Sequence, residues 1–158
     1  MDYRIEDISI EDTLGRFRLG TPAKLAVLPE NIIEASNVDE FIFTETLVDL
    51  NKLFKINEVD FEIFGQDTEM YRSRKSADLY LPAFFVSLSA IAQNPNVISV
   101  VLNLLSNYIY DALKGSIVRK TATVEIYIET NKNGKAKKIS YKGNAEGIKH
   151  LDKVIKNL

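Results

Sequence analysis

Two kinds of hydrophobic periodicity run along the chain and predict a mixture of strands and helices. Apolar and polar residues alternate in the segments 59–64 and 117–130, which is typical of strands with one buried face. Apolar residues recur at intervals of three and four in the segments 44–55, 95–114 and 145–158, as on the buried side of a helix. The pattern therefore predicts an α+β fold.

The first 65 residues are expected to form short strands and one helix. Turn-forming residues at 15, 20–22 and 29 separate brief apolar runs in residues 1–30, which favours short strands. Residues 29–35 have the composition of one or two helical turns. Thr44 is a candidate N-cap for a helix running to about Lys55, and the strand at 59–64 then ends at Gly65.

A long uncharged stretch runs from Leu79 to Tyr110. Its length suits a transmembrane segment, but serine, asparagine and glutamine interrupt it repeatedly. We therefore expect a helical hairpin, in which Pro82 opens the first helix and Asn94 caps the second. Such a hairpin serves as the core of a soluble domain, as a contact between subunits or as a bilayer segment; the first use is favoured, and no membrane span is predicted.

The last 44 residues predict a β-hairpin followed by a helix. Asn133 and Gly134 have the composition of a tight turn with two positive φ angles, and Ile139 and Tyr141 mark the returning strand. Asn144 is placed to cap the final helix. The uncharged hairpin is the natural layer to cover this amphipathic unit. We thus expect an acidic part, 1–78, and a basic module, 79–158, folded as one compact unit.

Composition excludes several kinds of site. The 158 residues include no cysteine and one histidine, His150, so disulfides, thiolate metal sites and zinc sites with two histidines are excluded. Glycine-rich nucleotide loops and the nucleophile elbow of hydrolases are missing from the sequence. The first residues do not resemble a secretory signal, so a cytoplasmic protein is expected, with no cofactor and no catalytic residue.

Charge is divided unevenly along the chain. Residues 1–70 hold 16 acidic and 6 basic residues, whereas residues 71–158 hold 6 acidic and 14 basic ones. Either the two parts fold together and neutralise each other, or a basic surface remains for a charged partner. The candidate interface or phosphate-binding residues are Arg119, Lys120, Lys132, Lys135, Lys137, Lys138, Lys142, Lys149, Lys153 and Lys156.

The partner of that basic surface is left open between a protein and a nucleic acid. Lysine outnumbers arginine in the set, which argues against reading of base edges but suits phosphate contacts or an electrostatic protein interface. Tyr127 and Tyr141 would add stacking surfaces if they face outward. A weaker alternative is a metal-dependent hydrolase that uses Asp60 and Glu62, although strand alternation already explains this pair as a solvated face.

The C-terminal half also carries a resemblance to a known family. An apolar helix pair ending in residues 110–115, a strand at 124–128, a glycine turn and a helix over 148–156 together resemble the effector-associated constant components of bacterial conflict systems. The resemblance implies a non-catalytic accessory or adaptor protein in antiviral defence, whose protein partner is an effector enzyme or a second copy of the chain. It implies no catalytic residue and leaves residues 1–78 without a counterpart.

Overall fold

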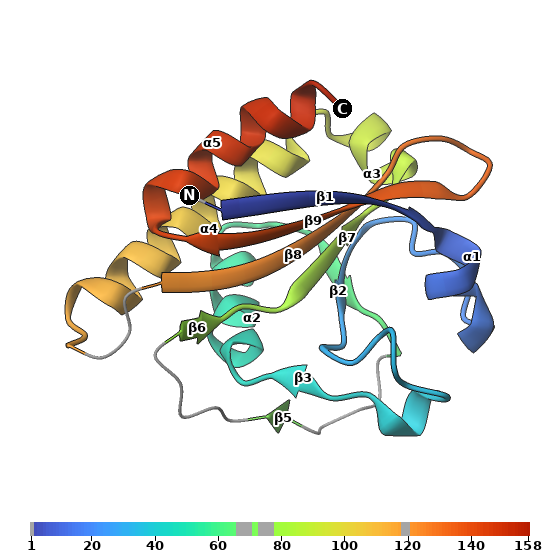
Figure 1. The fold of residues 1–158 in the computed structure, drawn as a ribbon, viewed down its shortest axis with the longest axis horizontal. Coiled ribbons are helices and arrows are strands. Elements are labelled where there is room, and N and C mark those ends of the chain that lie inside the picture. The colour runs from blue at the N-terminus through green and yellow to red at the C-terminus, as the bar shows by residue number, and fades with distance from the viewer. Residues whose placement is uncertain (1, 66–70, 73–77, 118–120) are drawn as a thin grey trace.

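A computed structural model describes residues 2–65, 71–72, 78–117 and 121–158, and these residues form an α+β fold around one mixed sheet (Figure 1). The sheet has the strand order β1-β9-β8-β7-β2-β4, and β6 also pairs with β8. Its strands are β1 (Asp2–Ser9), β2 (Leu25–Leu28), β4 (Phe61–Ile63), β6 (Asp78–Tyr80), β7 (Ala83–Val86), β8 (Thr121–Glu129) and β9 (Lys135–Gly143). The α+β class predicted from the sequence is thereby confirmed.

The two parts of the chain contribute strands to the same sheet. β1 runs antiparallel to β9, and β2 runs antiparallel to β7 and parallel to β4. A second, two-stranded sheet pairs β3 (Phe43–Thr44) with β5 (Tyr71–Arg72). Because β1 and β2 lie beside strands of the C-terminal part, the acidic and basic segments are interleaved in space.

Helices cover one face of the large sheet. They are α1 (Ile10–Thr13), α2 (Thr46–Ile56), α3 (Leu88–Gln93), α4 (Val97–Lys114) and α5 (Ala145–Lys156), with short 3-10 turns at Gly15–Phe17 and Val38–Glu40. In Figure 1, α2 and α4 lie behind the strands, and α5 packs against α4 and β9. Leu105 and Ile109 of α4 and Leu151 of α5 are fully buried, so the uncharged segment serves as core.

The uncharged segment begins as a strand rather than as a helix. Residues 83–86 form β7, and the first helix of the pair starts only at Leu88, where the Ser87 side chain accepts a hydrogen bond from the Ala90 amide. The expectation that Pro82 opens a helix is therefore wrong. The run Phe84–Val86 is buried on both faces, and such runs have no alternation that distinguishes a strand from a helix. None of the helices described is long and apolar enough to cross a bilayer.

Pro82 instead marks a bulge beside β8. Both β6 and β7 pair with β8 in parallel, and Tyr80 lies opposite Thr123 while Phe84 lies opposite Ile126. Phe84 follows Tyr80 by four positions, whereas Ile126 follows Thr123 by three. One extra residue is therefore accommodated at positions 81–83, where proline offers no amide hydrogen to the ladder. The bulge lies at the point where β6 gives way to β7.

Three local expectations about caps and turns need adjustment. Thr44 lies in β3, and α2 begins at Thr46 without a side-chain cap. Asn94 accepts a hydrogen bond from the Asn96 amide in the turn before α4, which starts at Val97. In the hairpin loop only Gly134 has a positive φ, of 82°, so the turn is not a two-residue pair. The cap at Asn144 is confirmed, since its side chain accepts from the Gly147 amide at 2.9 Å.

Candidate functional site: the open charged sheet face

The three strands at one end of the sheet present a charged face opposite the helices. Antiparallel register places residues Glu6, Lys138 and Tyr127 in one row, and Arg4 and Ser140 are aligned with Glu125 in the next. Opposite residues of antiparallel strands project to the same side, so alternate residues of β1, β9 and β8 share this face. We call the surface formed by Asp2, Arg4, Glu6, Thr123, Glu125, Tyr127, Lys138, Ser140 and Lys142 the open face.

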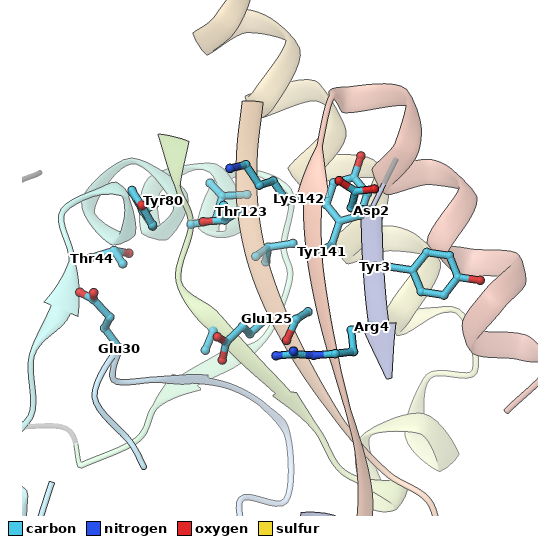
Figure 2. Close-up of a pocket in the computed structure, with 14 residues that line it drawn as sticks. Asp2, Tyr3, Arg4, Glu30, Thr44, Tyr80, Thr123, Glu125, Tyr141 and Lys142 are labelled. Atoms are coloured by element: carbon cyan, nitrogen blue, oxygen red, sulfur yellow. The ribbon is translucent and has the colours of Figure 1, made fainter. Parts of the chain in front are cut away.

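A cavity of about 520 Å³ lies on the open face next to the bulge. Its lining includes charged groups of both signs from strands β1, β8 and β9 and from the loop after β2; these are Asp2, Arg4, Glu30, Glu125 and Lys142. Hydroxyl residues (Thr44, Thr123, Ser140) and apolar residues (Leu81, Ala83, Val124) are also among the residues that line it. Figure 2 shows the Arg4 side chain extending across β9 toward Glu125, with Glu30 and Thr44 on the far side of the cavity. Mixed charge and a concave shape make this the candidate site.

Glu125 is held at the base of the cavity by two neighbours. The Tyr127 hydroxyl donates to the Glu125 carboxylate at 3.2 Å, and the Lys138 ammonium lies 3.6 Å from it. Lys138 also lies 5.8 Å from the centre of the Tyr127 ring. Tyr127 is 1% exposed, and burial, reinforced by the Glu125 charge, raises the pKa of its hydroxyl well above the usual range. The hydroxyl therefore remains a hydrogen-bond donor at neutral pH.

A second polar cluster stands at the β6 end of the cavity. Thr121 donates a hydrogen bond to Asp78, and the Lys142 ammonium lies 3.2 Å from the other Asp78 oxygen. The hydrogen bond from Thr121, assisted by Lys142, lowers the pKa of the Asp78 carboxyl. These contacts tie β6 to β8 and β9. They also hold Lys142 at the mouth of the cavity.

Loops of the N-terminal part form the opposite wall. The Glu30 amide donates to the Ile42 carbonyl at 2.7 Å, which joins the loop after β2 to the residue before β3. The Thr46 hydroxyl donates to the Tyr80 carbonyl at 2.7 Å and lies 3.0 Å from the Thr44 hydroxyl. Hydrogen bonds thus fasten the loop, α2 and β6 together, so the wall is a built part of the fold.

The lysines singled out in the sequence do not share one surface. Lys138 and Lys142 belong to the open face, whereas Lys135 and Lys137 project from the opposite face of β9 because side chains alternate along a strand. Lys132 lies in the hairpin loop. Three others, Lys149, Lys153 and Lys156, follow the exposed side of α5. Arg119 and Lys120 lie outside the described residues.

Four of these lysines, Lys137, Lys138, Lys142 and Lys156, form ion pairs with acidic residues. Lys137 pairs with Asp7 of β1, and Lys156 lies 3.0 Å from Asp152. The Asp7 pKa is lowered chiefly by its hydrogen bond with Lys137. Among the residues described, no ion pair is found for Lys132, Lys135, Lys149 or Lys153. Among the ion pairs described for this set, the one between Lys137 and Asp7 joins residues 1–70 to the C-terminal part, whereas Lys138, Lys142 and Lys156 contact acids at position 78 or beyond.

Two further predictions concern a metal site at Asp60 and Glu62 and stacking surfaces at two tyrosines. Asp60 lies 3.2 Å from the Lys24 ammonium, and Glu62 belongs to the sheet-edge strand β4. Within the described ranges, no three histidine, aspartate or glutamate side chains gather in a way that could hold a metal ion. Neither tyrosine offers a stacking surface: Tyr127 is buried, and Tyr141 is 3% exposed on the helix side, where its hydroxyl donates to the Asn144 carbonyl.

Sequence reasoning missed several residues of the site. The sequence predicts a helical turn at residues 29–35, which include Glu30, and a helix cap at Thr44, and no pattern singles out Arg4. They meet at the cavity because β1 joins β9 and because the loop after β2 folds back on β3. Such contacts join residues far apart in the chain, for which local periodicity carries no signal. The hydroxyl and charged residues alternating along residues 121–129 were the one available clue.

Comparisons with known proteins do not assign a family. A scan of protein-family models, a search of curated proteins and a search of solved structures found no match. The function must therefore be argued from the geometry of the open face.

Proposed function

We propose that the chain is a non-catalytic adaptor whose open face binds a protein partner. The observation that carries this proposal is the cavity of about 520 Å³ whose walls combine carboxylates with lysine and arginine. Charges of both signs arranged at fixed positions select a complementary surface and its orientation. Glu30 and Glu125 would repel a polyanion at this face, so the arrangement favours a polypeptide carrying both acidic and basic side chains.

The partner proposed is an effector enzyme encoded beside this chain in a bacterial defence system. This part of the proposal is supported by the resemblance of residues 80–158 to effector-associated constant components. Two lysines of the open face already contact acids that belong to the chain itself: Lys138 lies near Glu125, and the cavity-lining Lys142 lies near Asp78. A partner would exchange or extend these pairs, which contributes more to specificity than to binding energy.

The proposal is tested by calorimetric titration of the chain with the protein encoded by the adjacent gene. Two variants alter the cavity: Ser140→Tyr fills it without changing charge, and Lys142→Glu reverses a charge at its mouth. Each is expected to weaken binding by about tenfold or more. Lys52→Glu, on the exposed side of α2, is the matched control and should bind like the parent. Circular dichroism verifies that all variants fold.

Three results would overturn the adaptor proposal. The adjacent protein fails to bind the parent chain; the two cavity variants bind as tightly as the control; or the double variant Asp60→Asn with Glu62→Gln abolishes defence activity while the cavity variants retain it. The last result would favour the metal-dependent hydrolase.

A nucleic-acid-binding function is the second candidate, and one observation favours it. Lys149 and Lys153 lie one turn apart on the exposed side of α5 without an ion pair among the residues described. Such a row can contact successive phosphates. Retention on heparin should then fall steeply with salt and be lost in Lys149→Glu with Lys153→Glu; retention that is weak in the parent and unaltered in this variant would remove the candidate.

A further inference from the structure

Strand β1 leaves one side of the large sheet unpaired among the residues described. It is the terminal strand in the sheet order and bonds to β9 along Asp2–Ser9, eight residues without proline or glycine. A strand edge of this length presents a row of backbone donors and acceptors to another strand. Figure 1 shows β1 running alongside β9.

The hydrogen-bond pattern identifies the residues whose backbone groups point away from β9. The Ile10 amide donates to the Gly134 carbonyl at 2.7 Å, continuing the β1–β9 register. In antiparallel pairs, directly bonded residues alternate with unbonded ones. Even-numbered residues of β1 therefore bond to β9. The amides and carbonyls of Tyr3, Ile5 and Asp7 point toward the unpaired edge.

Two copies of β1 can pair across a twofold axis perpendicular to the sheet. This arrangement is antiparallel and keeps the open face of both copies on the same side. When Ile5 lies opposite Ile5 of the second copy, the outward backbone groups of Tyr3 and Asp7 also bond to each other. Arg4 then lies opposite Glu6 of the second copy, and the reverse pair forms by symmetry. These are unbonded positions, where side chains approach most closely.

Electrostatics select this register over its neighbours. A shift of each strand by one residue in one direction places Arg4 opposite Arg4 and Asp2 opposite Glu6. The shift in the other direction places Glu6 opposite Glu6. Like charges directly opposite each other destabilise a strand pair, so of these three registers only the one centred on Ile5 pairs Arg4 with Glu6 in both directions.

We propose that this chain forms a symmetric homodimer through β1, in which Arg4 and Glu6 of each copy pair with Glu6 and Arg4 of the other. Within one chain the Arg4 Nε atom lies 2.7 Å from the Glu6 carboxylate; the Arg4 side chain is 73% exposed and the Glu6 side chain 41%. The dimer adds two pairs between the copies, each between Arg4 of one copy and Glu6 of the other. Four side chains of alternating charge then surround the twofold axis. The two open faces become continuous, which brings the two cavities to one surface.

Charges on an edge strand also serve to prevent pairing, and their arrangement distinguishes the two roles. Protective edges carry charges that repel a copy of the same strand, such as repeated lysines. Here opposite signs stand at positions 4 and 6, symmetric about Ile5, so that a second copy is matched rather than repelled. The exposed Tyr3 ring, 44% accessible, would lie beside Asp7 of the second copy.

Sedimentation velocity of the full chain over a concentration series tests the proposal. The parent should form a dimer whose dissociation constant rises with salt. Arg4→Glu and Glu6→Arg each place like charges opposite each other and should raise the dissociation constant by about tenfold or more. The exchange Arg4→Glu with Glu6→Arg restores the opposite pairs and should restore the dimer.

A control and a folding measurement keep the result interpretable. Glu11→Arg reverses an exposed charge on α1, outside β1, and should dimerise like the parent. Thermal melts should show that the single variants remain folded, since an exposed ion pair contributes little to stability. A parent that stays monomeric at every concentration, single variants that dimerise normally, or an exchange variant that fails to recover would each overturn the proposed dimer. These measurements use no effector, so their outcome is independent of the adaptor proposal.

Discussion

The two faces of strands β8, β9 and β1 are built from the same alternating sequence but are held by different interactions. On the helix side, Ile126, Ile139 and Leu105 are fully or almost fully buried, and packing is dense. On the open face, carboxylates, lysines and hydroxyls contact one another around a cavity. Dense apolar packing stabilises the fold and tolerates little change, whereas exposed ion pairs contribute little to stability and remain available for binding.

The largest expected difference between the faces comes from changing the charge at one buried and one open-face position. Leu105→Asp introduces an unpaired carboxylate at a position that is 0% exposed. It should cost about 4 kcal/mol or more, a large share of the total stability of a domain. Glu125→Gln, on the open face, removes a carboxylate that is 45% exposed and should cost about 1–2 kcal/mol, because the largely buried Lys138 loses its ion-pair partner. Urea denaturation measures both, and equal midpoints for the two variants would contradict the contrast between the faces.

Gly147 allows a second test of packing on the helix side. A side-chain carbon at this position of α5 would lie 2.0 Å from the Tyr141 hydroxyl oxygen. Glycine to alanine normally stabilises a helix interior by about 1 kcal/mol, but Gly147→Ala should instead destabilise by about 1–3 kcal/mol because the tyrosine must shift. Denaturant unfolding measures the change.

A double variant separates the steric cause from other effects. Tyr141→Phe removes the hydroxyl and, in the Gly147→Ala background, should recover part of the loss. Gly115→Ala, where nothing lies within 4 Å of the added carbon, provides the matched control and should show no comparable loss. Equal destabilisation in both alanine variants would indicate that close contact with Tyr141 is not the reason for glycine at position 147.

The contrast also explains how much of the fold could be predicted from the sequence. Periodicity located the strand ending at Glu129, the helix after Asn144 and most of α4, because each has one polar and one apolar side. It failed at β7, whose residues are buried on both faces. The core-facing layer was thus largely predictable.

The candidate site was less predictable for a physical reason. Of its charged residues the sequence singles out Lys138 and Lys142, but the assembly of the site depends on β1 pairing with β9 across more than a hundred residues of chain. The Pro82 bulge, which lies beside the cavity, depends on an offset between two strand pairings. Neither feature leaves a periodic signal in the local sequence.

The smallest expected effect on stability comes from a substitution at Tyr127, a residue that combines apolar packing with a polar contact on the open face. Its ring is buried, yet its hydroxyl donates to Glu125 on the open face. Tyr127→Phe keeps most of the packing and removes this hydrogen bond, so near neutral pH it should lower the free energy of unfolding by about 1 kcal/mol. Tyr110→Phe, at a ring that is 61% exposed, serves as the control and should have no measurable effect.

The pH dependence of stability sharpens this test. Burial raises the pKa of Tyr127 in the folded chain, while in the unfolded chain a tyrosine ionises near pH 10. Below about pH 10 the hydroxyl is protonated in both states, and stability is independent of this group; above it the unfolded state loses the proton first, so the free energy of unfolding falls as pH rises. Burial also raises the Tyr141 pKa, so Tyr127→Phe should reduce the alkaline loss without abolishing it. Urea titrations from about pH 8 to pH 11 measure the slope; an identical alkaline slope in parent and variant would show that the Tyr127 hydroxyl is not buried against Glu125 in the folded chain.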